Sequence, residues 1–215
     1  MMKAFVRMLA LAAAVLVAAP GFAQEAPDAM VKRVSQDTLA TIRSDPLVQT
    51  GDQAHIRDLI EVKLVPHFDF TRMTALAMGR NWRTATPEQQ KRFVGALYRA
   101  LLKTYGGAIA DFTADRLKLL PFRGDPAATQ ATVRTLVTRS SGAAVPVDYR
   151  LRKTADGWKA FDVIIEGISY VKNYRTDLGA EVSAKGLEAV ITRLEHEGLE
   201  VHISTDKPAA TAGKH

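Results

Sequence analysis

The stretch Gly167-Ile168-Ser169-Tyr170-Val171 comes nearest to a catalytic motif in this chain. A nucleophile elbow places a serine between two glycines on a strained turn, which exposes the serine hydroxyl for attack. This stretch has the first glycine but lacks the second. We therefore expect Ser169 to cap a turn or a helix, and the motif predicts no catalytic residue.

Asp162 and Glu166 could in principle form a carboxylate pair for acid–base chemistry. If both side chains share one face of a strand, four residues of strand separate them by ~13 Å. That separation exceeds the spacing of the carboxylate pairs that hydrolyse glycosides. We expect both to be hydrogen-bonded acids near the end of a strand.

Neither a metal site nor a nucleic-acid site is predicted. The histidines do not show metal-ligand spacing such as a pair at i and i+4; they are His55, His67, His196, His202 and His215. The formal net charge is +6 and the sequence pI is near 9.6, but the basic residues are scattered singly among acids. Scattered charge of this kind is typical of a solvated surface, so nucleic acid is not expected as a partner.

The first 23 residues are typical of a secretory signal peptide. Lys3 and Arg7 precede an apolar run over residues 8–19, and small residues follow up to a predicted cleavage point near Ala23. The apolar run is shorter than the ~20 residues that a membrane-spanning helix needs. We therefore expect the chain to be exported and the segment removed.

The mature chain is expected to form one domain. It has no cysteine, so its stability must come from a hydrophobic core without disulfides. Residues 24–203 are sufficient for one such core and contain no low-complexity linker. Residues 204–215 are small, polar or proline without periodicity, and they predict a disordered tail.

A hairpin between Val145 and Glu166 is the clearest structural signal. Val145, Val147, Tyr149 and Leu151 alternate with more polar residues, which is the period of a strand with one buried face. Thr154-Ala155-Asp156-Gly157 supplies a tight turn, and a second strand begins at Trp158.

Four strands and two helical regions together predict an α+β fold with a single antiparallel sheet. The strands are expected at Leu117–Phe122, Thr129–Arg139, Val145–Lys153 and Trp158–Glu166. Helical patterns precede them between Pro27 and Gly79 and follow them from about Asn173 to Glu197, where Gly186 is expected to break the helix.

A long helix is expected to begin after Thr86. Thr86 can cap it, Pro87 suits its first position and Gln89 can complete a capping box. The residues behind this start form a wide apolar stripe, and Gly106-Gly107 is expected to loosen or end the helix.

From about Val31 to Leu194 the chain resembles the MlaC family, which is also called the toluene-tolerance family. Two blocks carry the resemblance in the same order and spacing. They are Phe68-Asp69-Phe70, Leu76 through Gly79, Trp82-Arg83, Pro87-Glu88-Gln89 and Thr104-Tyr105-Gly106, then Tyr149-Arg150, Trp158-Lys159, Phe161-Asp162-Val163, Glu166-Gly167-Ile168-Ser169 and Asn173-Tyr174-Arg175. The chain departs from the family pattern at Asp177-Leu178-Gly179, where an aromatic residue would be expected.

The resemblance implies a periplasmic phospholipid carrier on an NTF2-like or cystatin-like fold, in which helices wrap a four-stranded sheet around a hydrophobic pocket. It implies bound phospholipid as cargo, with no other cofactor and no enzymatic activity. The implied partners are an inner-membrane ABC transporter complex with an MCE-domain subunit and an outer-membrane lipoprotein–porin complex. Together they would maintain outer-membrane lipid asymmetry.

We assign the expected pocket to the capped helix and the facing strands. The assigned lipid-binding residues are Phe93, Leu97, Leu101, Tyr105, Val133, Val147, Tyr149, Leu151, Phe161, Val163, Ile165 and Ile168. Each could equally be plain core. Two other functions stay open on the residues alone: a periplasmic chaperone or interaction module that binds apolar segments, and a hydrolase-like enzyme on a similar scaffold.

Overall fold

The computed structural model describes residues 25–110, 117–125, 127–138 and 142–199. Within these residues a group of helices precedes a single antiparallel sheet, and two further helices follow it. The α+β prediction is therefore confirmed. The predicted signal peptide and the predicted tail from residue 204 lie outside the described residues.

The sheet is a meander whose spatial order follows the chain, β1-β2-β3-β4-β5, with every pair antiparallel. Its strands are β1 (Leu117–Leu119), β2 (Gln130–Thr138), β3 (Ala144–Thr154), β4 (Gly157–Ile165) and β5 (Ile168–Ser169). The expected count of four was wrong by one. Glu166 and Gly167 both have positive φ, at 53° and 83°, and this reverses the chain so that Ile168 pairs with Ile165.

A β-bulge interrupts the pairing of β3 with β4. Leu151 pairs with Ala160 while Arg150 pairs with Asp162, so Phe161 is the extra residue on β4. An extra residue changes the alternation of side chains along the strand. Phe161 therefore does not share a face with Val163 and Ile165, as strict alternation along the strand would require.

Most of the helices before the sheet begin at polar caps or at proline. Asp45, Asp52 and Asp69 each accept a backbone N–H at the start of their helix. The elements are α1 (Pro27–Ser44), α2 (Pro46–Gln49), α3 (Gln53–Lys63), the 3₁₀ turn η1 (Val65–His67), α4 (Phe70–Met78) and α5 (Asn81–Thr84).

The long helix α6 (Pro87–Ala110) begins at the predicted capping box. The Gln89 N–H donates to the Thr86 hydroxyl at 3.2 Å, and the Thr86 N–H donates to the Gln89 side chain at 3.0 Å. The helix runs through Gly106-Gly107, where we expected it to loosen or end. Glycine inside a helix costs only about 1 kcal/mol relative to alanine, so the packing of a long amphipathic helix can offset it.

Two helices follow the sheet, α7 (Tyr170–Lys185) and α8 (Leu187–His196). Ser169 caps α7 by accepting the Lys172 N–H at 3.1 Å, which confirms the expected capping role. Gly186 has a φ of 82° and separates the two helices, as predicted.

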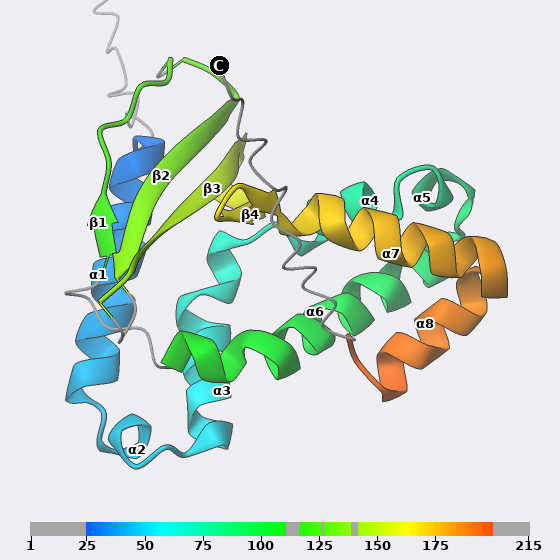
Figure 1. Cartoon of the computed structure of the whole chain (residues 1–215), viewed down its shortest axis with the longest axis horizontal. Helices are drawn as coiled ribbons and strands as arrows, with labels where there is room; N and C mark the ends of the chain where they lie inside the picture. The colour runs from blue at the N-terminus through cyan, green and yellow to red at the C-terminus, as the bar shows by residue number, and fades with distance from the viewer. Residues whose placement is uncertain (1–24, 111–116, 126, 139–141, 200–215) are drawn as a thin grey trace, which may run out of the picture.

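The core formed by the described residues has three clusters. One joins α4, α6, α7 and α8, a second joins α1 to the sheet, and a small third one joins Met73, Phe161 and Val171. Figure 1 shows the sheet and α1 at one end of the molecule, and α7 and α8 at the other, with α6 running below. The region between these two ends is where a cavity lies.

Candidate functional site

A cavity of about 410 Å³ lies between the sheet, α1, α3, η1, α4, α6 and the start of α7. Nearly all of its wall is apolar or aromatic side chain. The lining residues are Met30, Val31, Val34, Ser35, Thr38, Ile60, Leu64, Val65, His67, Phe68, Phe70, Met73, Tyr98, Leu101, Leu102, Tyr105, Leu117, Val137, Val147, Tyr149, Leu151, Ala160, Val163, Ile165, Tyr170, Val171 and Tyr174. Such a cavity suits an apolar ligand of small-molecule or lipid size.

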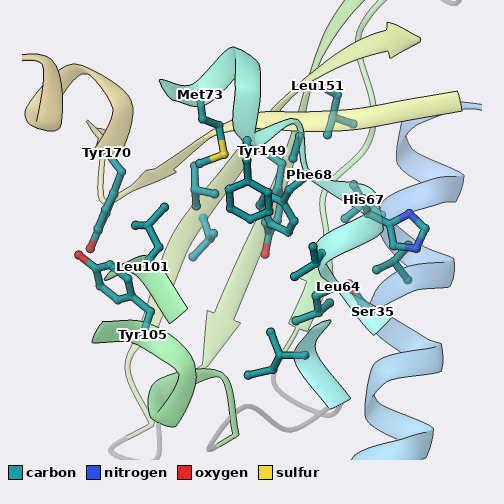
Figure 2. A pocket seen from close by; sticks show the side chains of 18 of the residues that line it. Ser35, Leu64, His67, Phe68, Met73, Leu101, Tyr105, Tyr149, Leu151 and Tyr170 are labelled. Atoms are coloured by element: carbon teal, nitrogen blue, oxygen red, sulfur yellow. The ribbon is translucent and has the colours of Figure 1, made fainter. Parts of the chain in front are cut away.

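Seven of the twelve residues that the sequence assigned to the pocket lie on this wall. They are Leu101, Tyr105, Val147, Tyr149, Leu151, Val163 and Ile165. Figure 2 shows Tyr149 in the middle of the cavity, with Leu101 and Tyr105 on one side and Leu151 beyond it. The structure thus brings the second half of α6 together with one face of β3 and β4.

Phe93 and Leu97 lie elsewhere, although they share the apolar stripe of α6. Both are almost fully buried in the cluster that α6 forms with α7 and α8. The helix is long enough for its first turns to pack on those helices, whereas its residues from Tyr98 onward reach the cavity.

The other three assigned residues also lie off the wall. The bulge moves Phe161 into the small cluster with Met73 and Val171. Val133 is covered in the cluster that joins the sheet to α1, and Ile168 is 44% exposed on β5 beyond the turn.

The sequence assignment missed the contributions of α1, α3, η1 and α4. In α1, helical spacing relates Met30, Val31 and Val34. This spacing predicted a helix, but it could not predict that the apolar face of the helix would line the cavity. The block Phe68-Asp69-Phe70 was part of the family resemblance, but the sequence did not assign it to the pocket. The Asp69 N–H donates to the Ala160 carbonyl at 2.8 Å, so this block is fastened to β4 beside the cavity.

Tyrosine is the main source of polar atoms in the cavity. All five tyrosines of the chain line it. The hydroxyls of Tyr105 and Tyr174 are hydrogen-bonded at 2.8 Å, and the rings of Tyr105 and Tyr170 meet edge to face. Burial raises the pKa of Tyr174 and raises that of Tyr149 to about 12, so every wall tyrosine with a shifted pKa stays neutral near pH 7.

A second polar region lies where α1 meets η1. Ser35, Thr38 and His67 line the cavity there, and Figure 2 shows Ser35 and His67 beside α1, across the cavity from Tyr105 and Tyr170. Burial, followed by the nearby charge of Arg33, lowers the pKa of His67. The imidazole is therefore neutral near pH 7, and this wall carries no charge.

Ser169 and Asp162 belong to a buried group of hydrogen bonds between the sheet and α7. The Ser169 hydroxyl donates to Asp162 Oδ2 at 2.6 Å, and the Val171 N–H donates to Asp162 Oδ1 at 3.1 Å. Arg150 Nη1 lies 3.5 Å from Asp162 Oδ2. These bonds fix the start of α7 to the sheet, and the expectation that Asp162 is a hydrogen-bonded acid is confirmed.

In residues 25–110, 117–125, 127–138 and 142–199, no three histidine or acidic side chains gather as metal ligands would. None of the helices in that part of the chain combines the length and apolar character needed to cross a bilayer.

The structure is similar to that of a phospholipid-binding protein from Ralstonia solanacearum, solved in complex with a phospholipid. The TM-score is 0.74 and the sequence identity is 34%, with 80% of this chain and 96% of the other covered. The fold that carries the cavity is thus shared with a protein that holds a phospholipid.

The relatives found by sequence include the following two proteins. The toluene tolerance protein Ttg2D of Pseudomonas putida is 33% identical over 104 residues, and this match spans 48% of each chain. The intermembrane phospholipid transport system binding protein MlaC of Haemophilus influenzae is 16% identical over 185 residues, which are 85% of this chain and 86% of the relative. The family model described as MlaC protein matches residues 32–196. These residues include almost every element that encloses the cavity, and the chain belongs to the MlaC family.

Proposed function

We propose that this protein binds phospholipid through its acyl chains in the cavity and carries it through the periplasm. The apolar cavity is the observation that carries the proposal, because it combines space with a wall that offers few hydrogen bonds. The similarity to a protein solved with a phospholipid supports the same ligand class.

The energetics of acyl chains fit a carrier. Each methylene kept from water contributes ~0.8 kcal/mol, so two chains of ordinary length represent on the order of 25 kcal/mol of exposure during transfer across an aqueous gap. A protein that encloses most of that length removes most of this barrier. Because the contacts are non-covalent, the cargo can still be released when another protein stabilises an open state.

The proposed route joins the two membranes of the cell envelope. The name of the Haemophilus relative refers to intermembrane phospholipid transport. We propose the corresponding partners for this chain: an inner-membrane ABC transporter complex with an MCE-domain subunit and an outer-membrane lipoprotein–porin complex. The predicted signal peptide supports a periplasmic location.

Lipid extraction tests the binding step directly. The mature protein would be purified without detergent, extracted with organic solvent and analysed for phospholipid by mass spectrometry. We expect phospholipid at a stoichiometric ratio to protein. An extract free of phospholipid, from protein that is folded by circular dichroism, would contradict the proposal and would favour a chaperone of apolar segments.

A further inference from the structure

The hydroxyl of Thr38, a residue of the cavity wall, is buried and has no hydrogen-bond partner in the part of the chain that the structure describes. Thr38 lies on α1, lines the cavity and is 4% exposed. Among the described residues, its Oγ1 is the one buried side-chain polar atom without a hydrogen-bond partner. Native proteins leave few such groups, and each one calls for an explanation.

Other threonines in this protein show what Thr38 lacks. The buried Thr74 and Thr135 donate to the carbonyls of Phe70 and Val147, each at 2.7 Å. Thr41, one turn further along α1, donates to the Asp37 carbonyl at 2.9 Å, as threonine in a helix often does. The Thr38 hydroxyl makes no bond of this kind, so a ligand that reaches this part of α1 would supply its missing partner.

The surroundings of Thr38 restrict the chemistry of that ligand. Val34, one turn before Thr38 on α1, lines the cavity together with Ile60 and Leu64, and a charged group such as a phosphate would be strongly penalised among such residues. A neutral hydrogen-bond acceptor attached to a hydrocarbon chain can pair with the Thr38 hydroxyl without placing a charge among these apolar residues. The acyl ester carbonyl of a glycerolipid is such a group, and a hydroxyl can donate to it.

Two further polar residues line the cavity near the same helix. Ser35 precedes Thr38 by one turn on the same helix face, and His67 lies nearby on η1; both are half-buried. The charged residues closest to His67 include Arg33 and Lys159 as well as Glu25 and Asp37. A phospholipid offers a group of each kind: acyl chains for the apolar wall, ester carbonyls for the Thr38 hydroxyl and a charged head group for the charged residues near His67.

We propose that Thr38 donates a hydrogen bond to an acyl ester carbonyl of the bound lipid, so that the cavity selects ester-linked over ether-linked phospholipids. This inference rests on the proposed function. An ether-linked lipid has the same chains and head group but lacks the carbonyl, so it would leave the Thr38 hydroxyl unpaired.

A competition experiment tests the selection. The purified protein would be incubated with vesicles that contain equal amounts of diester and diether phosphatidylethanolamine with identical chain lengths, then re-isolated and extracted for mass spectrometry. We expect the wild-type protein to take up about five-fold more of the diester lipid, the effect of one neutral hydrogen bond. Thr38→Val, which keeps the shape but removes the hydroxyl, should bring the ratio near one, whereas Thr38→Ser should retain the preference.

Thermal unfolding of the lipid-free proteins supplies a second measurement. Thr38→Val should unfold at the same temperature as the wild type or higher, because it removes an unsatisfied buried hydroxyl. The matched control Thr74→Val removes a satisfied buried hydroxyl from a residue that does not line the cavity; it should lower the unfolding temperature and leave the lipid ratio unchanged.

Three outcomes would overturn the inference. Equal uptake of both lipids by the wild type, or a preference that persists in Thr38→Val, would overturn it while leaving the carrier function intact. Uptake of neither lipid would overturn the carrier function and this inference together.

Discussion

Asp162 is fully buried and connects three parts of the molecule. Its carboxylate lies on β4, and its partners are Arg150 on β3 and the two groups at the start of α7, the Ser169 hydroxyl and the Val171 N–H. The Arg150 guanidinium also lies over the Phe161 ring, 4.9 Å from its centre. One side chain thus fixes α7 to the sheet at the place where the bulge bends β4.

Replacing Asp162 with alanine should therefore be severely destabilising. The change leaves the Ser169 hydroxyl and the Val171 N–H buried without an acceptor, and we expect the free energy of unfolding to fall by about 3 kcal/mol. Urea denaturation followed by circular dichroism would measure it. The control is Asp177→Ala, which removes an exposed carboxylate from α7; a loss of similar size in both variants would contradict the role given to Asp162.

Tyr149 gives the protein a specific sensitivity to alkali. Its pKa is raised to about 12 by burial, compared with about 10 in an unfolded chain. The folded state therefore holds this proton more tightly, so the corresponding stability is complete below pH ~10 and is lost as the pH rises toward ~12.

Between these pH values, the free energy of unfolding should fall by about 2 to 3 kcal/mol more in the wild type than in Tyr149→Phe. Denaturation curves at a series of alkaline pH values would measure the difference. The pKa values of Tyr98 and Tyr174 are also raised by burial, and those residues remain in both proteins. Parallel pH profiles for the two proteins would refute the assignment to Tyr149.

At the scale of elements, the start of α6 was predictable from four adjacent residues. The reciprocal bonds of Thr86 and Gln89 are local, so they do not depend on the rest of the fold. The strand alternation and the break at Gly186 were predictable for the same reason.

Thr86→Ala should destabilise the protein by about 1 kcal/mol, because it removes the cap of the longest helix. Thr192→Ala is a suitable comparison, since Thr192 is exposed inside α8 and alanine is the better helix former. We expect that variant to be as stable as the wild type or slightly more so. Chemical denaturation of both would decide, and an unchanged midpoint for Thr86→Ala would count against the cap.

The bulge at Phe161 and the direction of α1 could not be predicted in the same way. A bulge depends on how two strands and α7 meet around Asp162, and strict alternation along β4 gives no sign of it. Likewise, an apolar stripe indicates that a helix has one buried face, but it does not indicate which element covers that face. The sequence therefore indicated the β3 and β4 wall of the cavity, whereas the walls from α1, α3 and η1 emerged only with the tertiary structure.

At the scale of the whole molecule, the cavity separates two of the core clusters. One cluster joins α1 to the sheet and the other joins α6, α7 and α8, while wall residues come from both sides. A bound lipid would add contacts to both clusters at once, and binding to the folded state alone stabilises it. The same apolar residues could have closed into a filled core, and periodicity cannot distinguish the two outcomes.

A charge on the cavity wall should prevent loading without unfolding the protein. Val163 and Ile164 are adjacent, half-buried residues of β4, but only Val163 lines the cavity. We expect Val163→Asp to reduce the co-purified phospholipid at least about ten-fold, because acyl chains cannot solvate a carboxylate. Extraction and mass spectrometry would measure the loss.

Ile164→Asp is the control for Val163→Asp, since it introduces the same charge one residue away. It should retain its phospholipid, and circular dichroism would establish that both variants are folded. Equal loading of the two variants would show that this face of β4 does not contact the cargo.

The distribution of aromatic residues has a practical consequence. All five tyrosines line the cavity, whereas Trp82 and Trp158 lie outside it. The ultraviolet absorption of the tyrosines therefore comes from the cavity alone, and the tryptophan signal comes from the surrounding framework. A difference spectrum between the loaded and empty protein would contain an internal reference, so occupancy could be followed in real time, without a label, as one vesicle population gives up lipid to another.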